Sequence, residues 1–64
     1  SVMNNMGHMK WVSTLTQEDL ESMKQLIKQA QERNKTEIYF QQRKYGILYI
    51  NSIIRLKEEL LLIN

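Results

Sequence analysis

The sequence predicts an all-α fold, an antiparallel helical hairpin that pairs with a second copy to form a four-helix bundle. Three observations lead to this prediction. The stretch 38–64 contains no proline and one glycine. Its apolar residues recur in steps of three and four, which is the spacing of a helix face. A shorter amphipathic stretch precedes it, and the three residues between them are short enough to force two helices to run side by side in opposite directions.

Length and composition favour an assembly over a lone monomer. With 64 residues, the chain forms one small domain, and the core of such a domain rarely supplies more than about 3–5 kcal/mol. Because no cysteine is present, disulfides and thiolate metal sites cannot add stability. One histidine cannot build a metal site, and no cofactor motif occurs, so we expect neither group. A homodimer is therefore the expected state.

Residues 1–9 differ in character from the rest of the chain. They combine three methionines with polar residues and a glycine, without periodicity. We expect a disordered arm or a tag remnant here, and a single helical-hairpin domain over 10–64.

The first helix has a clear start signal at Thr16. Acidic residues follow this threonine directly, where the helix dipole favours them. Leu15 and Leu20 have the spacing of a hydrophobic staple. We expect the helix to span 17–33, with one apolar stripe made of Leu20, Met23, Ile27 and Ala30.

A turn is expected over 34–36, followed by a long second helix over 37–63. Asn34 tolerates the left-handed conformation that ends helices. The one weak point is the segment 45–50, Tyr-Gly-Ile-Leu-Tyr-Ile. Its aromatic and β-branched residues also suit a strand, but no turn residues flank it, so we favour a helix.

The long helix would carry two apolar arcs. The first arc contains Ile38, Tyr45, Tyr49, Ile53, Leu56, Leu60 and Ile63; the second contains Phe40, Ile47, Ile50, Ile54 and Leu61. The first helix can cover only one of the arcs, so another chain should cover the other. We therefore predict the second arc as the oligomer or partner interface, with Trp11 and Tyr39 as additional candidate contacts.

Basic residues gather around the expected loop end of the hairpin. They are Lys28, Arg33, Lys35, Arg43 and Lys44. Interleaved with tyrosines and glutamines, they are candidate contacts to the phosphates of a nucleic acid. They are somewhat more typical of a solvated surface, because a nucleic-acid-binding protein of this size is usually more basic than a formal net charge of +2.

These features predict a binding protein and not an enzyme. The chain lacks a cysteine nucleophile and a glycine-rich phosphate loop, and its carboxylates suit solvated helix ends. The first hypothesis is a non-catalytic, homo-oligomeric regulator or adaptor that binds a protein partner through an apolar helix face. The alternatives are a nucleic-acid-binding dimer and an oligomerisation segment of a larger protein. No stretch is long enough to span a membrane, and we expect a cytoplasmic protein.

Overall fold

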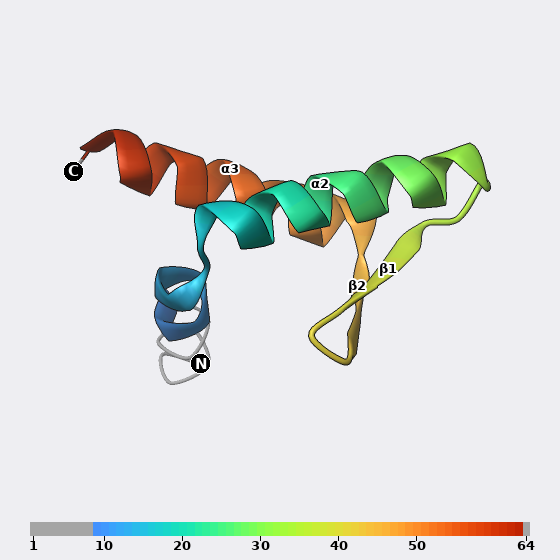
Figure 1. Ribbon diagram of the computed structural model, residues 1–64, viewed down its shortest axis with the longest axis horizontal. Coiled ribbons are helices and arrows are strands. Elements are labelled where there is room, and N and C mark those ends of the chain that lie inside the picture. Colours follow the sequence, from blue (N-terminus) through green and yellow to red (C-terminus); the bar gives the residue numbers. More distant parts are fainter. Residues whose placement is uncertain (1–8, 64) are drawn as a thin grey trace.

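The computed structural model describes residues 9–63, which form a mixed α/β domain (Figure 1). A short helical segment covers residues 9–14. It is followed by helix α2 (Gln17–Glu32), strand β1 (Glu37–Phe40), strand β2 (Arg43–Gly46) and helix α3 (Ile47–Ile63). The arm expected at 1–9 lies outside the described residues, apart from Met9 in the first helical segment.

The prediction of an all-α helical hairpin, and with it of a four-helix bundle, is wrong. Residues 37–46 form an antiparallel β-hairpin where the second helix was expected to begin. Ile38 pairs with Tyr45, and Phe40 pairs with Arg43. The spacing of seven between Ile38 and Tyr45 looked like a helical repeat, but these residues are cross-strand partners placed symmetrically about a tight turn.

That turn consists of Gln41 and Gln42, both with left-handed backbone conformations. Their φ angles are 50° and 67°, as a two-residue type I′ hairpin turn requires. Asn-Gly or Asp-Gly sequences usually mark such turns, because those residues adopt positive φ at little cost. Gln-Gln carries no such signal, which explains why the hairpin was missed.

The start of α2 confirms the predicted cap. The Thr16 hydroxyl accepts a hydrogen bond from the Asp19 N–H at 3.1 Å, and the Asp19 carboxylate accepts one from the Thr16 N–H at 2.9 Å. This reciprocal capping box satisfies two backbone donors that the helix geometry leaves unpaired.

The end of α2 confirms the role expected for Asn34. Its φ angle is 58°, and the chain reverses there in a Schellman motif. The Lys35 N–H donates to the Ala30 carbonyl at 2.8 Å, and the Asn34 N–H donates to the Gln31 carbonyl at 3.1 Å. The chain then enters β1 at Glu37.

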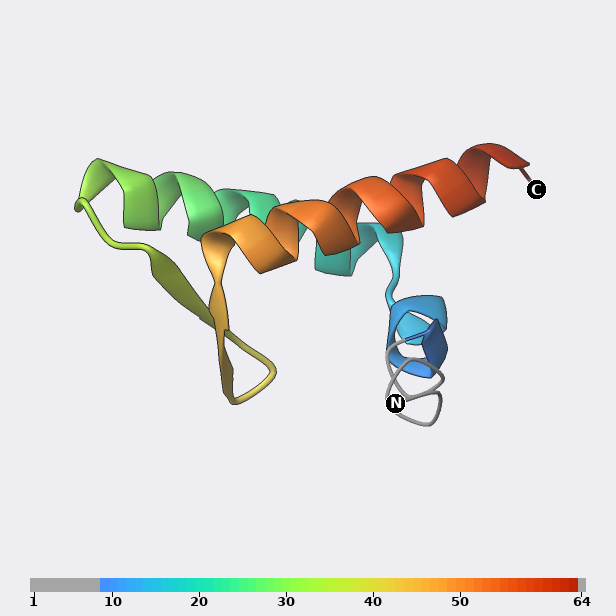
Figure 2. The ribbon, with the colours of Figure 1, turned by 180° about the vertical axis from the view of Figure 1, so that it is seen from behind.

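The two long helices lie side by side and run in opposite directions, and the β-hairpin and the 9–14 segment both project from the same side of this pair (Figures 1 and 2). The core lies where these four parts meet. It consists of Val12, Leu15, Leu20, Met23, Ile27, Ala30, Ile38, Phe40, Ile47, Ile50, Ile53 and Ile54.

The position of the first residue of α3 determines which side of this helix packs on the core. The Ile47 N–H donates to the Thr36 carbonyl at 2.9 Å, so α3 starts directly beside the entry to β1. From this start, helical spacing turns Ile47, Ile50 and Ile54 towards the core.

The left-handed turn generates a prediction about stability. Replacing Gln42 by glycine should raise the free energy of unfolding by on the order of 0.5–1 kcal/mol, because glycine adopts positive φ without steric cost. The same replacement at Gln29, an exposed position inside α2, should lower it by about 1 kcal/mol. Urea denaturation of both variants measures the difference, and a destabilised Gln42→Gly protein would contradict the turn geometry.

Candidate interaction surfaces

The residues predicted as an interface lie mostly inside the protein's own core. Phe40, Ile47, Ile50 and Ile54 have exposed fractions of 9%, 8%, 0% and 6%, and only Leu61 is substantially exposed, at 46%. In the structure α2 and the hairpin cover this second arc. The argument that another chain must cover it therefore no longer applies.

The first arc of α3 is the side that remains partly open. Tyr49, Leu56 and Leu60 are only partly buried, and Ile63 is 79% exposed. These residues recur in steps of seven, four and three along one side of the helix. Two members of the first arc, Ile38 and Ile53, are buried at 4% and 5% exposure, so the chain itself covers most of the second arc and part of the first.

Aromatic rings extend this open side from α3 to the rest of the fold. Trp11 stacks on Tyr45 with ring centroids 5.3 Å apart and an interplanar angle of 15°. Tyr45 stacks in turn on Tyr49, at 6.0 Å and 14°. We call this set of residues the apolar strip; it comprises Trp11, Tyr45, Tyr49, Leu56, Leu60 and Ile63.

A hydrogen bond positions the first member of the strip. The Trp11 indole Nε1–H donates to the Gln41 side-chain oxygen at 3.1 Å. This bond joins the 9–14 segment to the turn of the hairpin, and the ring stack joins both to α3. Three separate parts of the chain thus hold the strip in shape.

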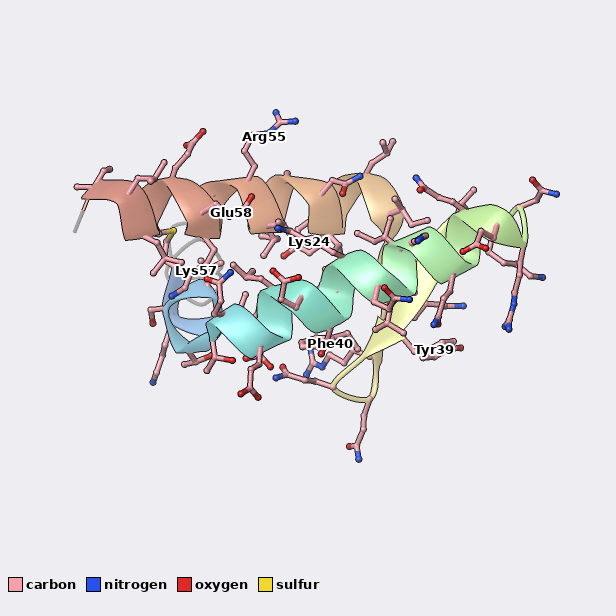
Figure 3. The ribbon with its side chains drawn as sticks, turned by 45° about the horizontal axis from the view of Figure 1, so that its top comes forward. Lys24, Tyr39, Phe40, Arg55, Lys57 and Glu58 are labelled. Atoms are coloured by element: carbon pink, nitrogen blue, oxygen red, sulfur yellow. The ribbon has the colours of Figure 1, made fainter. Side chains whose placement is uncertain are left out.

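Polar contacts at the surface link the two helices to each other. Lys24 of α2 reaches Glu58 of α3 with an Nζ–Oε2 distance of 2.8 Å (Figure 3). The hydrogen bond that Lys24 donates to the Glu58 carboxylate is the main reason that the pKa of Lys24 is raised above its usual value. Lys57 Nζ also lies 3.4 Å from the Ser13 carbonyl, so α3 contacts the 9–14 segment as well.

The last part of α3 extends beyond the start of α2, in both Figure 1 and Figure 2. Four consecutive apolar residues, Leu60–Ile63, end the described helix. Leu62 is 86% exposed on one side, and Ile63 lies about 100° round the helix from it, in line with the strip. This end therefore presents apolar side chains on several sides.

A second surface lies on the outer face of the hairpin. Residues alternate between faces along a strand, and Phe40 lies against α2 while Tyr39 projects away from the helices (Figure 3). Tyr39 is 68% exposed and pairs across the strands with Lys44. The Lys44 Nζ lies 3.9 Å from a Glu37 oxygen, and both side chains are about half exposed.

The predicted basic residues lie on several different elements of the fold. Arg43 and Lys44 are exposed on β2, and Lys35 is exposed just before β1. Lys28 is exposed on α2, and Arg33 caps the end of that helix. The hairpin thus collects only part of the predicted set. The sequence indicated Tyr39 both as an additional interface contact and as one of the tyrosines interleaved with the basic residues, but its outward direction depends on the strand.

No group of three potential metal-ligating side chains occurs among residues 9–63. Within the same residues, no helix has the length and apolar character needed to cross a membrane.

Comparisons with known proteins do not assign this chain to a group. No protein family matches the sequence. No curated protein matches it, and no solved structure matches its fold. Its surfaces therefore have to be interpreted from their own geometry.

The buried part of the strip predicts a loss of stability at alkaline pH. Burial, and to a smaller extent the neighbouring Tyr45, raises the pKa of Tyr49 above its usual value of about 10. Unfolding lowers that pKa, so the unfolded state loses its proton first as the pH rises, and the free energy of unfolding falls above about pH 10.

Thermal denaturation from about pH 8 to about pH 11 tests this effect. Tyr49→Phe should lose stability less steeply than the unaltered protein, because it has no hydroxyl to ionise at this position. Tyr39→Phe, which changes an exposed ring, should follow the unaltered protein. Equal slopes for all three proteins would show that Tyr49 does not contribute.

Proposed function

We propose that this protein is a non-catalytic protein–protein interaction module, a small homo-oligomeric regulator or adaptor that assembles through the apolar strip. One observation supports this proposal most strongly. Along one side of α3, Tyr49, Leu56 and Leu60 pack against the core but stay partly exposed, and Ile63 is 79% exposed.

The spacing of the strip suits contact with another helix. Side chains in steps of three and four form a ridge, and such ridges pack into the grooves of a second helix. Burying one large aliphatic side chain that was exposed contributes about 1.5–3 kcal/mol. The strip offers several such side chains on a rigid support, so its burial would offset a substantial part of the cost of association.

A second copy of this chain is the occupant that we propose. A two-fold symmetric contact needs one surface that complements itself, and an apolar ridge without buried charges meets this requirement. A domain of this size also gains from assembly, because its own core contributes little net stability. The strip joins three parts of the chain, so a partner that packs on it would also hold these parts together.

The regulatory role follows from this assembly. An apolar helix of another protein could take the place of the second copy, so self-association and partner binding would compete. The same strip would serve an oligomerisation segment of a larger protein. A cytoplasmic location stays a prediction, favoured by the lack of cysteine.

Two neighbouring residues at the end of α3 provide a matched test. Ile63→Lys places a charge in line with the strip, whereas Leu62→Lys places the same charge about 100° away on the helix. Both residues are highly exposed, at 79% and 86%, so neither change should unfold the monomer. Ile63→Lys should weaken dimerisation by at least about tenfold, because an apolar contact is replaced by a desolvated charge.

Light scattering over a range of protein concentrations, with circular dichroism as the folding control, measures this effect. Leu62→Lys should dimerise like the unaltered protein. If both variants lose the dimer equally, the strip is not the specific contact. A protein that stays monomeric at all concentrations would contradict the second copy as occupant, and would leave the strip to a helix of another protein.

A further inference from the structure

We propose that the outer face of the β-hairpin binds single-stranded nucleic acid, with a base stacked on Tyr39 and phosphates held by Lys44 and Lys35. This surface lies on the opposite face of the hairpin from Tyr45. The inference therefore does not depend on the apolar strip or on the function proposed for it.

The first argument is the exposure of an aromatic ring on an open face. Tyr39 is 68% exposed and projects away from the helices (Figure 3). The residues on its face of the hairpin are Glu37, Lys44 and Gly46. A Cβ atom added to Gly46 would meet no atom within 4 Å, so nothing covers this end of the face. Most of the Tyr39 side chain is thus open to solvent and can contact a flat ligand.

The second argument is the charge around the ring. Lys44 lies directly across from Tyr39 in the strand pairing. Lys35 precedes β1, so a second cation occurs near the base of the hairpin. Arg43 pairs with Phe40 and therefore belongs to the opposite face. The turn and the start of β2, residues 41–44, contain no acidic residue. An exposed aromatic ring flanked by cations is the arrangement that binds single strands without strong sequence preference.

Single strands fit this surface better than duplexes or acidic proteins. A base inside a duplex has both faces covered, so Tyr39 can stack only on an unpaired base. An acidic peptide would use the cations but has no general need for the ring. Glu37 opposes any anion here, since it lies 3.9 Å from the Lys44 Nζ. This ion pair is about half exposed and can be exchanged for a phosphate at little cost.

The test measures fluorescence anisotropy of a labelled 12-nucleotide single-stranded DNA of mixed sequence, with the equivalent RNA, a DNA duplex and poly-glutamate as competitors. Two phosphate contacts predict that affinity falls by about sevenfold between 50 and 200 mM salt. Tyr39→Ala should weaken binding by at least about fivefold, whereas Tyr39→Phe should keep it. Glu37→Gln should strengthen binding, because it removes the opposing charge.

Charge reversal separates a specific site from general attraction. Lys44→Glu combined with Lys35→Glu should abolish binding, while Arg55→Glu should leave it unchanged. Arg55 is a suitable control because it is exposed and points outward from α3, away from the hairpin (Figure 3). Circular dichroism confirms that each variant folds.

Four results would overturn the inference. The first is no binding at about 20 mM salt, at which electrostatic attraction is strong. The second is an equal loss of affinity in Arg55→Glu and in the charge-reversal variant of the proposed site, and the third is unchanged affinity in Tyr39→Ala. The last is tighter binding of the duplex or of poly-glutamate than of the single strand. The last result would assign the surface to a groove contact or to an acidic protein.

Discussion

The pairing of β1 with β2 is the constraint on which the rest of the structure depends. The hairpin folds the chain back over four residue pairs, and α3 begins where β2 ends. The hydrogen bond from the Ile47 N–H to the Thr36 carbonyl, 2.9 Å long, places the first turn of α3 against the start of the hairpin. Once that start is set, helical periodicity decides which side chains of α3 enter the core.

The same pairing gives the protein two separate surfaces. Because successive residues of a strand point to opposite faces, Tyr45 turns inward to stack with Trp11, while Tyr39 turns outward into solvent. One surface is apolar and continues along α3, and the other is small, open and flanked by cations. A contact on the apolar strip would therefore leave the outer face of the hairpin accessible, so assembly and nucleic-acid binding could occur together.

The helices are held in place by packing and only adjusted by polar contacts. Leu20, Met23 and Ile50 are fully buried and join α2 to α3. The ion pair between Lys24 and Glu58 lies at the surface, with both side chains more than 40% exposed, where solvent screens such interactions. Its contribution lies in the relative placement of the helices and not in the overall stability.

By itself, the sequence determined the parts of this protein that depend on local interactions. Thr16 and Asp19 cap α2 through bonds within one turn, Asn34 ends it through its tolerance of positive φ, and the inward stripe of α2 follows from helical spacing. The two apolar sides of α3 were also visible in the pattern of residues. Each of these features involves neighbours in the chain, so the residue types alone reveal it.

Only the tertiary structure decided whether residues 37–46 form strands or a helix. It also decided which side of α3 stays open. A Gln41–Gln42 turn has no sequence signal, and the two apolar arcs are similar in composition. The choice depends on burying Ile38 and Phe40 together with Ile47, Ile50 and Ile54 in one core. Burial of apolar surface contributes about 25 cal/mol per Å² whatever the distance between residues in the chain, so it overrode local preferences that differ by only tenths of a kcal/mol to about 1 kcal/mol per residue.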